Sequence, residues 1–464
     1  MPLSCSAFWP GLGDKLKKTA DVLTDLSRPS NVAIHSNVAL VGSVEAAGAD
    51  EDKKRNEKEL DGLRRKPKLE AIPTTEVDSF HLAPWDVLHT LARAVALARR
   101  GAGRGLAEHW GSLKYSQALI GGSDVYMKLS AEGRENADYY KALQSDELGI
   151  GFGLALAKQI LTRRYPHHMV SIIPADTALR AGWALTSRDK GPRVGYRYRP
   201  RFFAEVWKPG EPSRVFPIEA KGNHSNASAS HAQLASASAH VEAVHIGSWD
   251  ETPSLIFSTE LPVEGPLTIH ALRAAGRDGL LDDSAESAKR NFNNPVEDEN
   301  FFPGIQPPAK NETLPQKEPG FHITPERHEW FRHVLARTSA AGLTAFAGDG
   351  AATVQYLTKR QGSRHFTGFA HAAAGSVQDA HAELLGTRFV GTDHVFRLNR
   401  TRVEAFSGVA EDLFRHLGAG RVEQYRHEIY LRRGAWPVDT WDSKWRGPVS
   451  ISPDGSVLAM RVLT

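Results

Sequence analysis

Residues 197–224 read RYRPRFFAEVWKPGEPSRVFPIEAKGNH and decide how the middle of the chain folds. From 196 to 207 the residue types alternate with the two-residue period of a strand, which predicts a strand with one face toward a core. The segment 208–213 contains Pro, Gly and Ser and predicts a turn. A second extended run follows at 214–220, so the sequence predicts a β-hairpin.

Glu219 and Lys221 end the second run, with Ala220 between them. Side chains two residues apart on a strand share a face, so the carboxylate and the ammonium are predicted to project to the same side. A carboxylate there can hold a divalent cation, and the ammonium can orient a water and stabilise charge on a phosphate. The structural alternative is an ion pair on a solvated strand face.

Further elements are predicted on both sides of the hairpin in the sequence. An apolar stripe at helical spacing predicts a helix at 145–165, which Pro166 ends, and a β-branched run at 169–173 predicts a strand. After the hairpin, an Ala- and Ser-rich helix is predicted at 228–245 and further strands at 254–258 and 267–271.

With its elements in this order, the segment 146–247 resembles the PD-(D/E)xK nuclease superfamily, which has the restriction-endonuclease-like fold. The resemblance implies that Glu219 is a metal ligand and Lys221 the catalytic lysine. It also implies that Glu147, on the first helix, is an additional acidic residue beside the metal. Gln233 matches a glutamine on the second helix of some branches, where it belongs to the nucleic-acid-binding surface.

One position departs from the family pattern. Members place an Asp after a Pro at the start of the first hairpin strand, whereas Pro200 is followed here by Arg201. If the turn is centred between residues 210 and 211, Phe202 lies opposite Glu219. Arg201 or Phe202 therefore occupies the place of the expected acid.

Two other acids are candidate metal ligands in place of the missing Asp. Glu205 lies in the same strand, four residues beyond Arg201, and Asp176 follows the preceding strand. The sequence leaves open which of them replaces the Asp, and whether either does.

Arginines in the first strand suggest a contact with nucleic acid. Arg197, Arg199 and Arg201 alternate with other residues, which predicts three guanidinium groups on one strand face, suited to phosphate contacts. An exposed cationic strand face without a ligand is the alternative.

Three glycines at Gly149, Gly151 and Gly153 have the spacing of a phosphate-binding loop. No strand precedes them and no Gly-Lys-Ser/Thr follows, so they predict close packing of a helix on the sheet instead.

Composition limits the classes to which the chain can belong. The 464 residues include 57 Lys and Arg and 54 Asp and Glu, a formal net charge of +3, so a nucleic-acid contact must come from local clusters. A single cysteine, Cys5, excludes an intramolecular disulfide framework and a cysteine-based zinc cluster. No run approaches the roughly 18 apolar residues of a membrane span, and no secretory signal is evident. We therefore expect a cytoplasmic protein without a membrane partner.

The length predicts two or three domains. Apolar residues at helical spacing predict a packing helix near 84–95, while the charged stretch 50–70 and the Pro-rich stretch 284–320 predict connectors. We expect an α+β multidomain fold whose central restriction-endonuclease-like α/β core is a mixed sheet flanked by helices. The predicted parts are a mostly helical N-terminal region at 1–140, the restriction-endonuclease-like domain at 141–283, the linker at 284–320 and a small α+β domain at 321–464.

The expected function is that of a metal-dependent DNA nuclease that uses Mg²⁺ or Mn²⁺. By analogy alone, such a nuclease belongs to a defence or restriction system. The alternative is a catalytically inactive, nuclease-like subunit that binds nucleic acid or a protein partner, including a second copy of the chain. Arg201 favours the alternative, whereas Glu147, Glu219 and Lys221 favour the enzyme.

Overall fold

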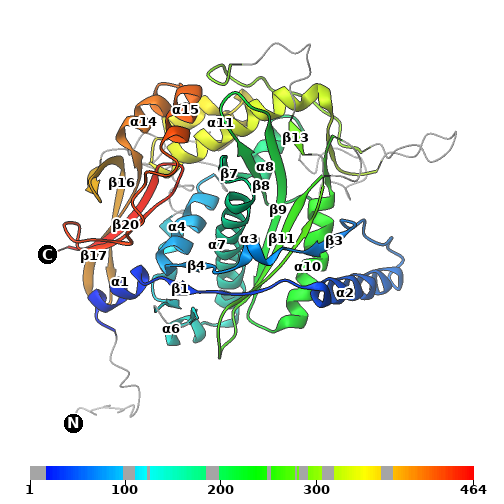
Figure 1. Cartoon of the computed structure of the whole chain (residues 1–464), viewed down its shortest axis with the longest axis horizontal. Coiled ribbons are helices and arrows are strands. Elements are labelled where there is room, and N and C mark those ends of the chain that lie inside the picture. The colour runs from blue at the N-terminus through cyan, green and yellow to red at the C-terminus, as the bar shows by residue number, and fades with distance from the viewer. Residues whose placement is uncertain are drawn as a thin grey trace, which may run out of the picture.

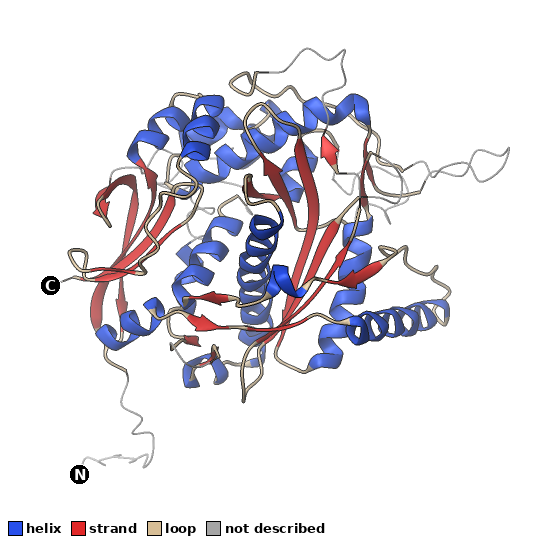
Figure 2. Ribbon diagram, in the orientation of Figure 1, coloured by secondary structure: helices blue, strands red, loops and turns tan. Residues whose placement is uncertain are grey.

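The computed structural model describes residues 17–97, 110–122, 126–183, 198–247, 252–276, 279–281, 291–305, 318–366 and 380–463. Helices and several β-sheets form this part of the chain, which confirms the expected mixed α and β character. Two large sheets lie on either side of a pair of helices, α4 (Pro84–Val95) and α7 (Asp138–Arg164) (Figures 1 and 2).

The central sheet carries the hairpin predicted from the sequence. In spatial order its main strands are β2 (Ala33–His35), β12 (Thr268–Ala274), β11 (Ser254–Glu260), β9 (Ser213–Asn223), β8 (Phe202–Trp207) and β7 (Met169–Pro174). β7, β8 and β9 pair antiparallel in sequence order. β9 and β11 are parallel, because α10 (Ala227–Glu242) connects them as a crossover helix. Two short strands pair with this sheet, β3 (Leu69–Ala71) with β12 and β13 (Leu280–Leu281) with β9.

Helices α7 and α10 cover opposite faces of the central sheet (Figure 2). On the α7 side, a Cβ at Gly149 would lie 2.5 Å from the carbonyl oxygen of Lys221, and one at Gly153 would lie 2.8 Å from the Cβ of Ala220. Such distances are too short for a side chain, so the glycines allow close contact between helix and sheet, as predicted. Lys221, next to Ala220 on β9, instead reaches Ser236 of α10 on the other face.

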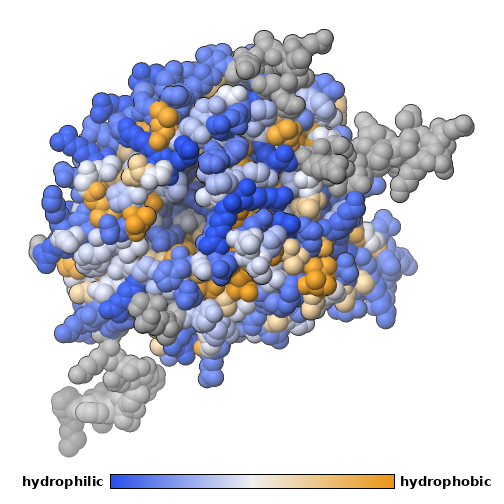
Figure 3. Space-filling model, in the orientation of Figure 1, coloured by the Kyte–Doolittle hydropathy of each residue, from blue (hydrophilic) through white to orange (hydrophobic). Residues whose placement is uncertain are grey.

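In the described part of the chain, no helix has both the length and the apolar character needed to cross a bilayer. The face of the molecule in Figure 3 is mainly hydrophilic, and its hydrophobic residues form small separate groups.

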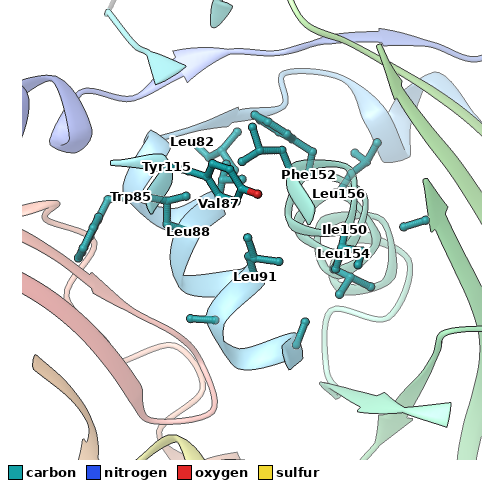
Figure 4. Packing of buried hydrophobic residues seen from close by; sticks show 14 of the residues in the cluster. Leu82, Trp85, Val87, Leu88, Leu91, Tyr115, Ile150, Phe152, Leu154 and Leu156 are labelled. Carbon is teal, nitrogen blue, oxygen red and sulfur yellow. The ribbon is translucent and has the colours of Figure 1, made fainter. Parts of the chain in front are cut away.

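The interior between α4 and α7 is apolar (Figure 4). Leu88 and Leu91 of α4 and Phe152 and Leu154 of α7 belong to one hydrophobic cluster, and all four side chains are buried. Full burial of side chains of this size contributes about 1.5–3 kcal/mol each. The bounds of α4 confirm the helix predicted near 84–95. Trp85 connects this layer to the C-terminal sheet, because its indole N–H donates to the carbonyl oxygen of Leu458 at 2.8 Å.

The first 140 residues are less purely helical than expected, because strands β2 and β3 join the central sheet. Helix α2 (Val38–Asn56) covers the first part of the charged stretch 50–70. The remaining described elements of this region are α1 (Thr19–Ser27), β1 (Ser30–Asn31), α3 (Thr74–Val77), β4 (His81–Leu82), the 3₁₀ helix η1 (Gly111–Tyr115), β5 (Leu119–Ile120), β6 (Lys128–Leu129) and α6 (Ala131–Arg134).

The second large sheet lies near the C-terminus and is antiparallel throughout. In spatial order it contains β15 (Ala380–Leu384), β16 (Thr387–Leu398), β17 (Thr401–Ala410), β20 (Ser456–Val462), β19 (Gly447–Ile451) and β18 (Trp441–Asp442). The helices of this region are α11 (His328–Phe346), which the 3₁₀ helix η2 (Pro325–Arg327) precedes, α12 (Gly350–Tyr356), α13 (Lys359–Phe366), α14 (Glu411–Gly418) and α15 (Val422–Leu431). In sequence, the short helix α8 (Ala175–Arg180) follows β7 and precedes β8 of the central sheet.

The predicted linker is packed where it is described. Residues 291–305 contain no helix or longer strand, as expected, but Phe292 and Ile305 are buried and Arg337 of α11 donates to the carbonyl oxygen of Phe292. Beyond it, β14 (Phe321–Ile323) pairs parallel with β10 (Val244–Ile246), and α11 packs on the central sheet. The four-part division stays a prediction, but β14 and α11 contribute to the core around the central sheet.

Candidate functional site

Glu219 and Lys221 lie on one face of β9, as the strand period predicts. The ammonium nitrogen of Lys221 is 3.9 Å from Oε1 of Glu219 and 3.4 Å from the hydroxyl of Ser236 on α10. Ser236 also lines a pocket of about 570 Å³ between α2 and α10, so this end of the site is close to the surface.

The hairpin register places Arg201 opposite Glu219. β8 and β9 pair with Phe202 opposite Ile218 and Val206 opposite Arg214, one residue away from the predicted register, in which Phe202 faced Glu219. The prediction was wrong because the turn is centred on Gly210, which has a positive φ of 79°.

The backbone of Arg201 is held from two sides. Its N–H donates to Oε2 of Glu219 at 2.8 Å, and its carbonyl oxygen accepts from the N–H of Ala175 at 2.9 Å. The position where the family pattern places an Asp is therefore fixed tightly against Glu219 and is occupied by an arginine.

The side chain of Arg201 bridges two carboxylates. Its Nη1 is 2.7 Å from Oδ1 of Asp146 on α7, and its Nε is 3.4 Å from Oε1 of Glu219. We call Asp146, Arg201, Glu219 and Lys221 the Arg201 cluster. Two cations and two carboxylates from α7, β9 and the segment before β8 thus meet at one point.

Glu219 is fully buried, and this dominates its ionisation. Burial raises the pKa of its carboxyl to about 7, although the charges of Arg201 and Lys221 and the N–H of Arg201 act in the opposite direction. Its Oε1 is inaccessible to solvent and accepts no hydrogen bond among the described residues. A carboxyl with such a pKa changes its protonation near neutral pH, a property common at functional sites.

Residues around the cluster fix its geometry. His240 of α10 shares a hydrogen bond of 2.9 Å between Nδ1 and the carbonyl oxygen of Arg199. Burial lowers the pKa of His240 to about 4, so the ring is neutral at pH 7 and donates this bond. Gln233 donates to the carbonyl oxygen of Gly222 at 2.8 Å and accepts from Ser258 at 2.7 Å. The predicted nucleic-acid-binding glutamine is therefore engaged in joining α10 to β9 and β11.

Glu147 does not reach the Arg201 cluster by any described contact. Its carboxylate accepts from the hydroxyl of Tyr115 and forms an ion pair of 2.7 Å with Lys114. The neighbouring Asp146 is the acid of α7 that contacts the cluster. The sequence interpretation named Glu147 and not Asp146, and it started the helix at residue 145, whereas α7 begins at Asp138, seven residues earlier.

Glu205 and Asp176 have their own partners. Glu205 is buried on β8 and forms a bidentate ion pair with Arg426 of α15, at 2.9 and 3.0 Å. Asp176 pairs with Arg180 and with Arg199. The structure does not bring the predicted ligands Glu147, Glu205 and Asp176 together with Glu219. In the described ranges, no group of three or more His, Cys, Asp or Glu side chains is placed to hold a metal ion.

The predicted arginine face is not a strand face. β8 begins at Phe202 rather than at residue 196, since the carbonyl oxygen of Arg199 bonds His240 rather than a neighbouring strand. The guanidinium group of Arg199 pairs with Asp176, and that of Arg201 lies in the cluster. Arg197 lies outside the described residues.

Comparisons of the chain with protein-family models, with curated proteins and with solved structures find no match.

Proposed function

We propose that the chain is a nuclease-like protein that binds nucleic acid through the Arg201 cluster without metal-dependent cleavage. The order of elements supports the nuclease-like class: α7, β7, the β8–β9 hairpin, α10 and β11 follow one another around one mixed sheet. Glu219, Ala220 and Lys221 stand near the end of β9, where the resemblance to the PD-(D/E)xK superfamily requires them.

Two cationic side chains of the cluster are accessible to a phosphate. Arg201 is 34% exposed and Lys221 is 19% exposed. A guanidinium and an ammonium side by side suit the oxygens of a backbone phosphate. Protonation of Glu219, whose pKa is about 7, leaves the cluster with a net positive charge and favours such an anion further.

The cluster does not fit a divalent cation. Arg201 already contacts both Asp146 and Glu219, Lys221 supplies a second positive charge beside Glu219, and Oε1 of Glu219 is buried. An ion placed there would lie beside the positive charges of Arg201 and Lys221. The guanidinium of Arg201 between the two carboxylates is the single observation that carries the proposal of binding without metal-dependent cleavage.

Arg201→Gln and Lys221→Gln are each expected to weaken nucleic-acid binding and its dependence on salt. Each substitution loses one phosphate contact, which lowers the slope of log affinity against log salt by about 0.9 on duplex DNA and by about 0.7 on single strands. Fluorescence anisotropy with labelled duplex DNA, single-stranded DNA and RNA, each at several salt concentrations, measures both quantities.

Lys208→Gln is the matched control, because Lys208 lies in the hairpin turn, at the end of the hairpin away from the cluster, and its side chain is 34% exposed, as is that of Arg201. It removes the same charge and is expected to leave the slope unchanged. If both cluster variants keep the wild-type slope, the cluster does not contact phosphate. If the wild-type protein binds none of the three probes, this result favours the alternative that the chain is a protein-binding subunit.

A metal-dependent DNA nuclease is the second candidate, and the Glu219–Lys221 pair favours it. Both residues match the positions to which the resemblance assigns a metal ligand and the catalytic lysine. A pKa of about 7 for Glu219 also suits a group that exchanges a proton near neutral pH. Mg²⁺ or Mn²⁺ is the cofactor that the resemblance implies, and it would require Arg201 to leave both carboxylates. A role in defence or restriction rests on analogy with the family.

Cleavage assays separate the two candidates. We expect wild-type protein with Mg²⁺ or Mn²⁺ to leave linear, circular and single-stranded DNA and RNA intact. A true nuclease would cut one of them, would lose this activity on Glu219→Ala, and would be slowed ~10²- to 10⁴-fold by Lys221→Ala. Lys208→Gln is the control, since Lys208 lies in the hairpin turn, at the end of the hairpin away from Glu219 and Lys221, and would keep the rate near that of the wild type.

A further inference from the structure

The surroundings of Arg201 suggest a role for its charge that does not involve nucleic acid. Asp146 is 45% exposed and Glu219 is buried, yet one guanidinium contacts both carboxylates. Nη1 is bound by Asp146, and Nε faces Glu219. The charge of Arg201 is thus held in the place that a bridging cation between these two acids would occupy.

Apart from the guanidinium of Arg201, the two carboxylates have few contacts that would prevent them from binding a cation. Oε2 of Glu219 accepts the backbone N–H of Arg201, which any residue at this position except proline would provide. Oε1 has no hydrogen bond from a described residue and is buried beside the guanidinium. Asp146 has no other ion pair among the residues that the structure describes. Removal of the guanidinium would therefore leave two carboxylates facing one space.

We propose that Arg201 is the permanent cation of this cluster, and that its side chain keeps Asp146 and Glu219 from binding a divalent cation such as Mn²⁺. This inference deepens the proposed function and rests on its site. Hard divalent cations prefer carboxylate oxygens, and their affinity follows the number of carboxylate charges that are free to bind them. In the wild type Arg201 contacts both carboxylates, whereas in Arg201→Ala Asp146 would lose its ion pair and Glu219 would keep only Lys221, 3.9 Å away.

The test is a titration with Mn²⁺, followed by electron paramagnetic resonance of the free ion, at pH 8, above the pKa of about 7 that Glu219 has in the wild type. The wild type is expected to show no saturable site up to about 1 mM, the weak end of natural Ca²⁺ sites. Arg201→Ala is expected to gain one site for each chain, with an affinity at least ~10-fold above any binding by the wild type.

Two further variants connect the gain to the cluster. Arg201→Lys keeps a cation at this position and is expected to bind Mn²⁺ as weakly as the wild type. Arg201→Ala combined with Asp146→Asn removes one of the two freed carboxylates and is expected to lose the gained site. Thermal unfolding without metal verifies that each variant is folded, and Arg201→Lys provides the comparison if Arg201→Ala is unfolded.

Tight Mn²⁺ binding by the wild type, or no gain in folded Arg201→Ala, would overturn the inference. Tight binding by Arg201→Lys would also overturn it, because the positive charge would then not be what excludes the ion. The titration contains no nucleic acid, so its outcome is independent of the anisotropy experiment. If the wild type binds DNA but Arg201→Ala gains no metal site, this inference is refuted and the proposed function is not.

Discussion

Glu205→Ala is expected to lower the free energy of unfolding by about 3–5 kcal/mol, because it leaves the charge of Arg426 buried without its carboxylate. Glu205 lies on β8 with no exposed surface, and its two carboxylate oxygens accept from the two Nη atoms of Arg426. Ser213 donates a third hydrogen bond to this carboxylate at 2.7 Å. The guanidinium also lies over the ring of Trp207, 3.7 Å from its centroid.

Chemical denaturation followed by tryptophan fluorescence measures this loss. Asp412→Ala is the matched control, because Asp412 and Arg432 form an ion pair in which each side chain is 40% exposed, and we expect a loss below about 1 kcal/mol. Glu205→Leu combined with Arg426→Leu removes both charges and is expected to recover most of the stability. A loss for Glu205→Ala as small as that of the control would contradict the assigned role.

The pair of Glu205 and Arg426 explains why one predicted metal ligand has a different role. The sequence shows an acid inside an apolar strand, which is compatible with a metal ligand or with a buried ion pair. The partner that decides between them lies 221 residues further along the chain. Only tertiary packing brings α15 against β8, and no local pattern near either residue indicates it.

Features set by local spacing could be predicted. The helix near 84–95, the strand that became β7 and the close packing at Gly149 and Gly153 follow from periodicity and from side-chain size. The common face of Glu219 and Lys221 follows from the two-residue repeat of a strand.

Features that depend on the conformation of a turn or on how a helix packs could not be predicted. The register of β8 against β9 depends on the conformation of the turn at Gly210, and a shift of one residue exchanged Phe202 for Arg201 opposite Glu219. Asp146 and Glu147 are adjacent in sequence but contact different neighbours, and the way α7 packs on the central sheet decides which one reaches the cluster. The sequence thus placed Glu219 and Lys221 on one face of β9, as the structure has them, but named Glu147 rather than the adjacent Asp146 as the acid of the helix.

Asp454 joins the C-terminal sheet to the helices beside the central sheet. It lies in the turn between β19 and β20, and Oδ2 is 3.1 Å from Nη2 of Arg93 on α4. Oδ1 accepts from the N–H and the hydroxyl of Ser456. Lys158 of α7 reaches the same turn, where its ammonium is 3.4 Å from the hydroxyl of Ser452. Burial alone would raise the pKa of Asp454, but the charges of Arg93 and Lys158 and the bond from Ser456 hold it well below its usual 3.8.

Asp454→Asn is therefore expected to lower the free energy of unfolding by about 2–4 kcal/mol at pH 7, because Arg93 and Lys158 lose the carboxylate that compensates their charges. A carboxyl whose pKa is lowered by folding stabilises the protein above its usual pKa, and this contribution is lost as the pH falls through the lowered value. The difference between wild type and variant should thus stay constant from pH 7 to about 5 and shrink below about 4. Urea denaturation at each pH measures it, with Asp439→Asn, at an exposed acid of the same region, as a control that should change stability by less than about 0.5 kcal/mol. A difference that stays constant down to pH 2, or a loss at pH 7 no larger than that of the control, would show that Asp454 does not hold the two cations as the structure indicates.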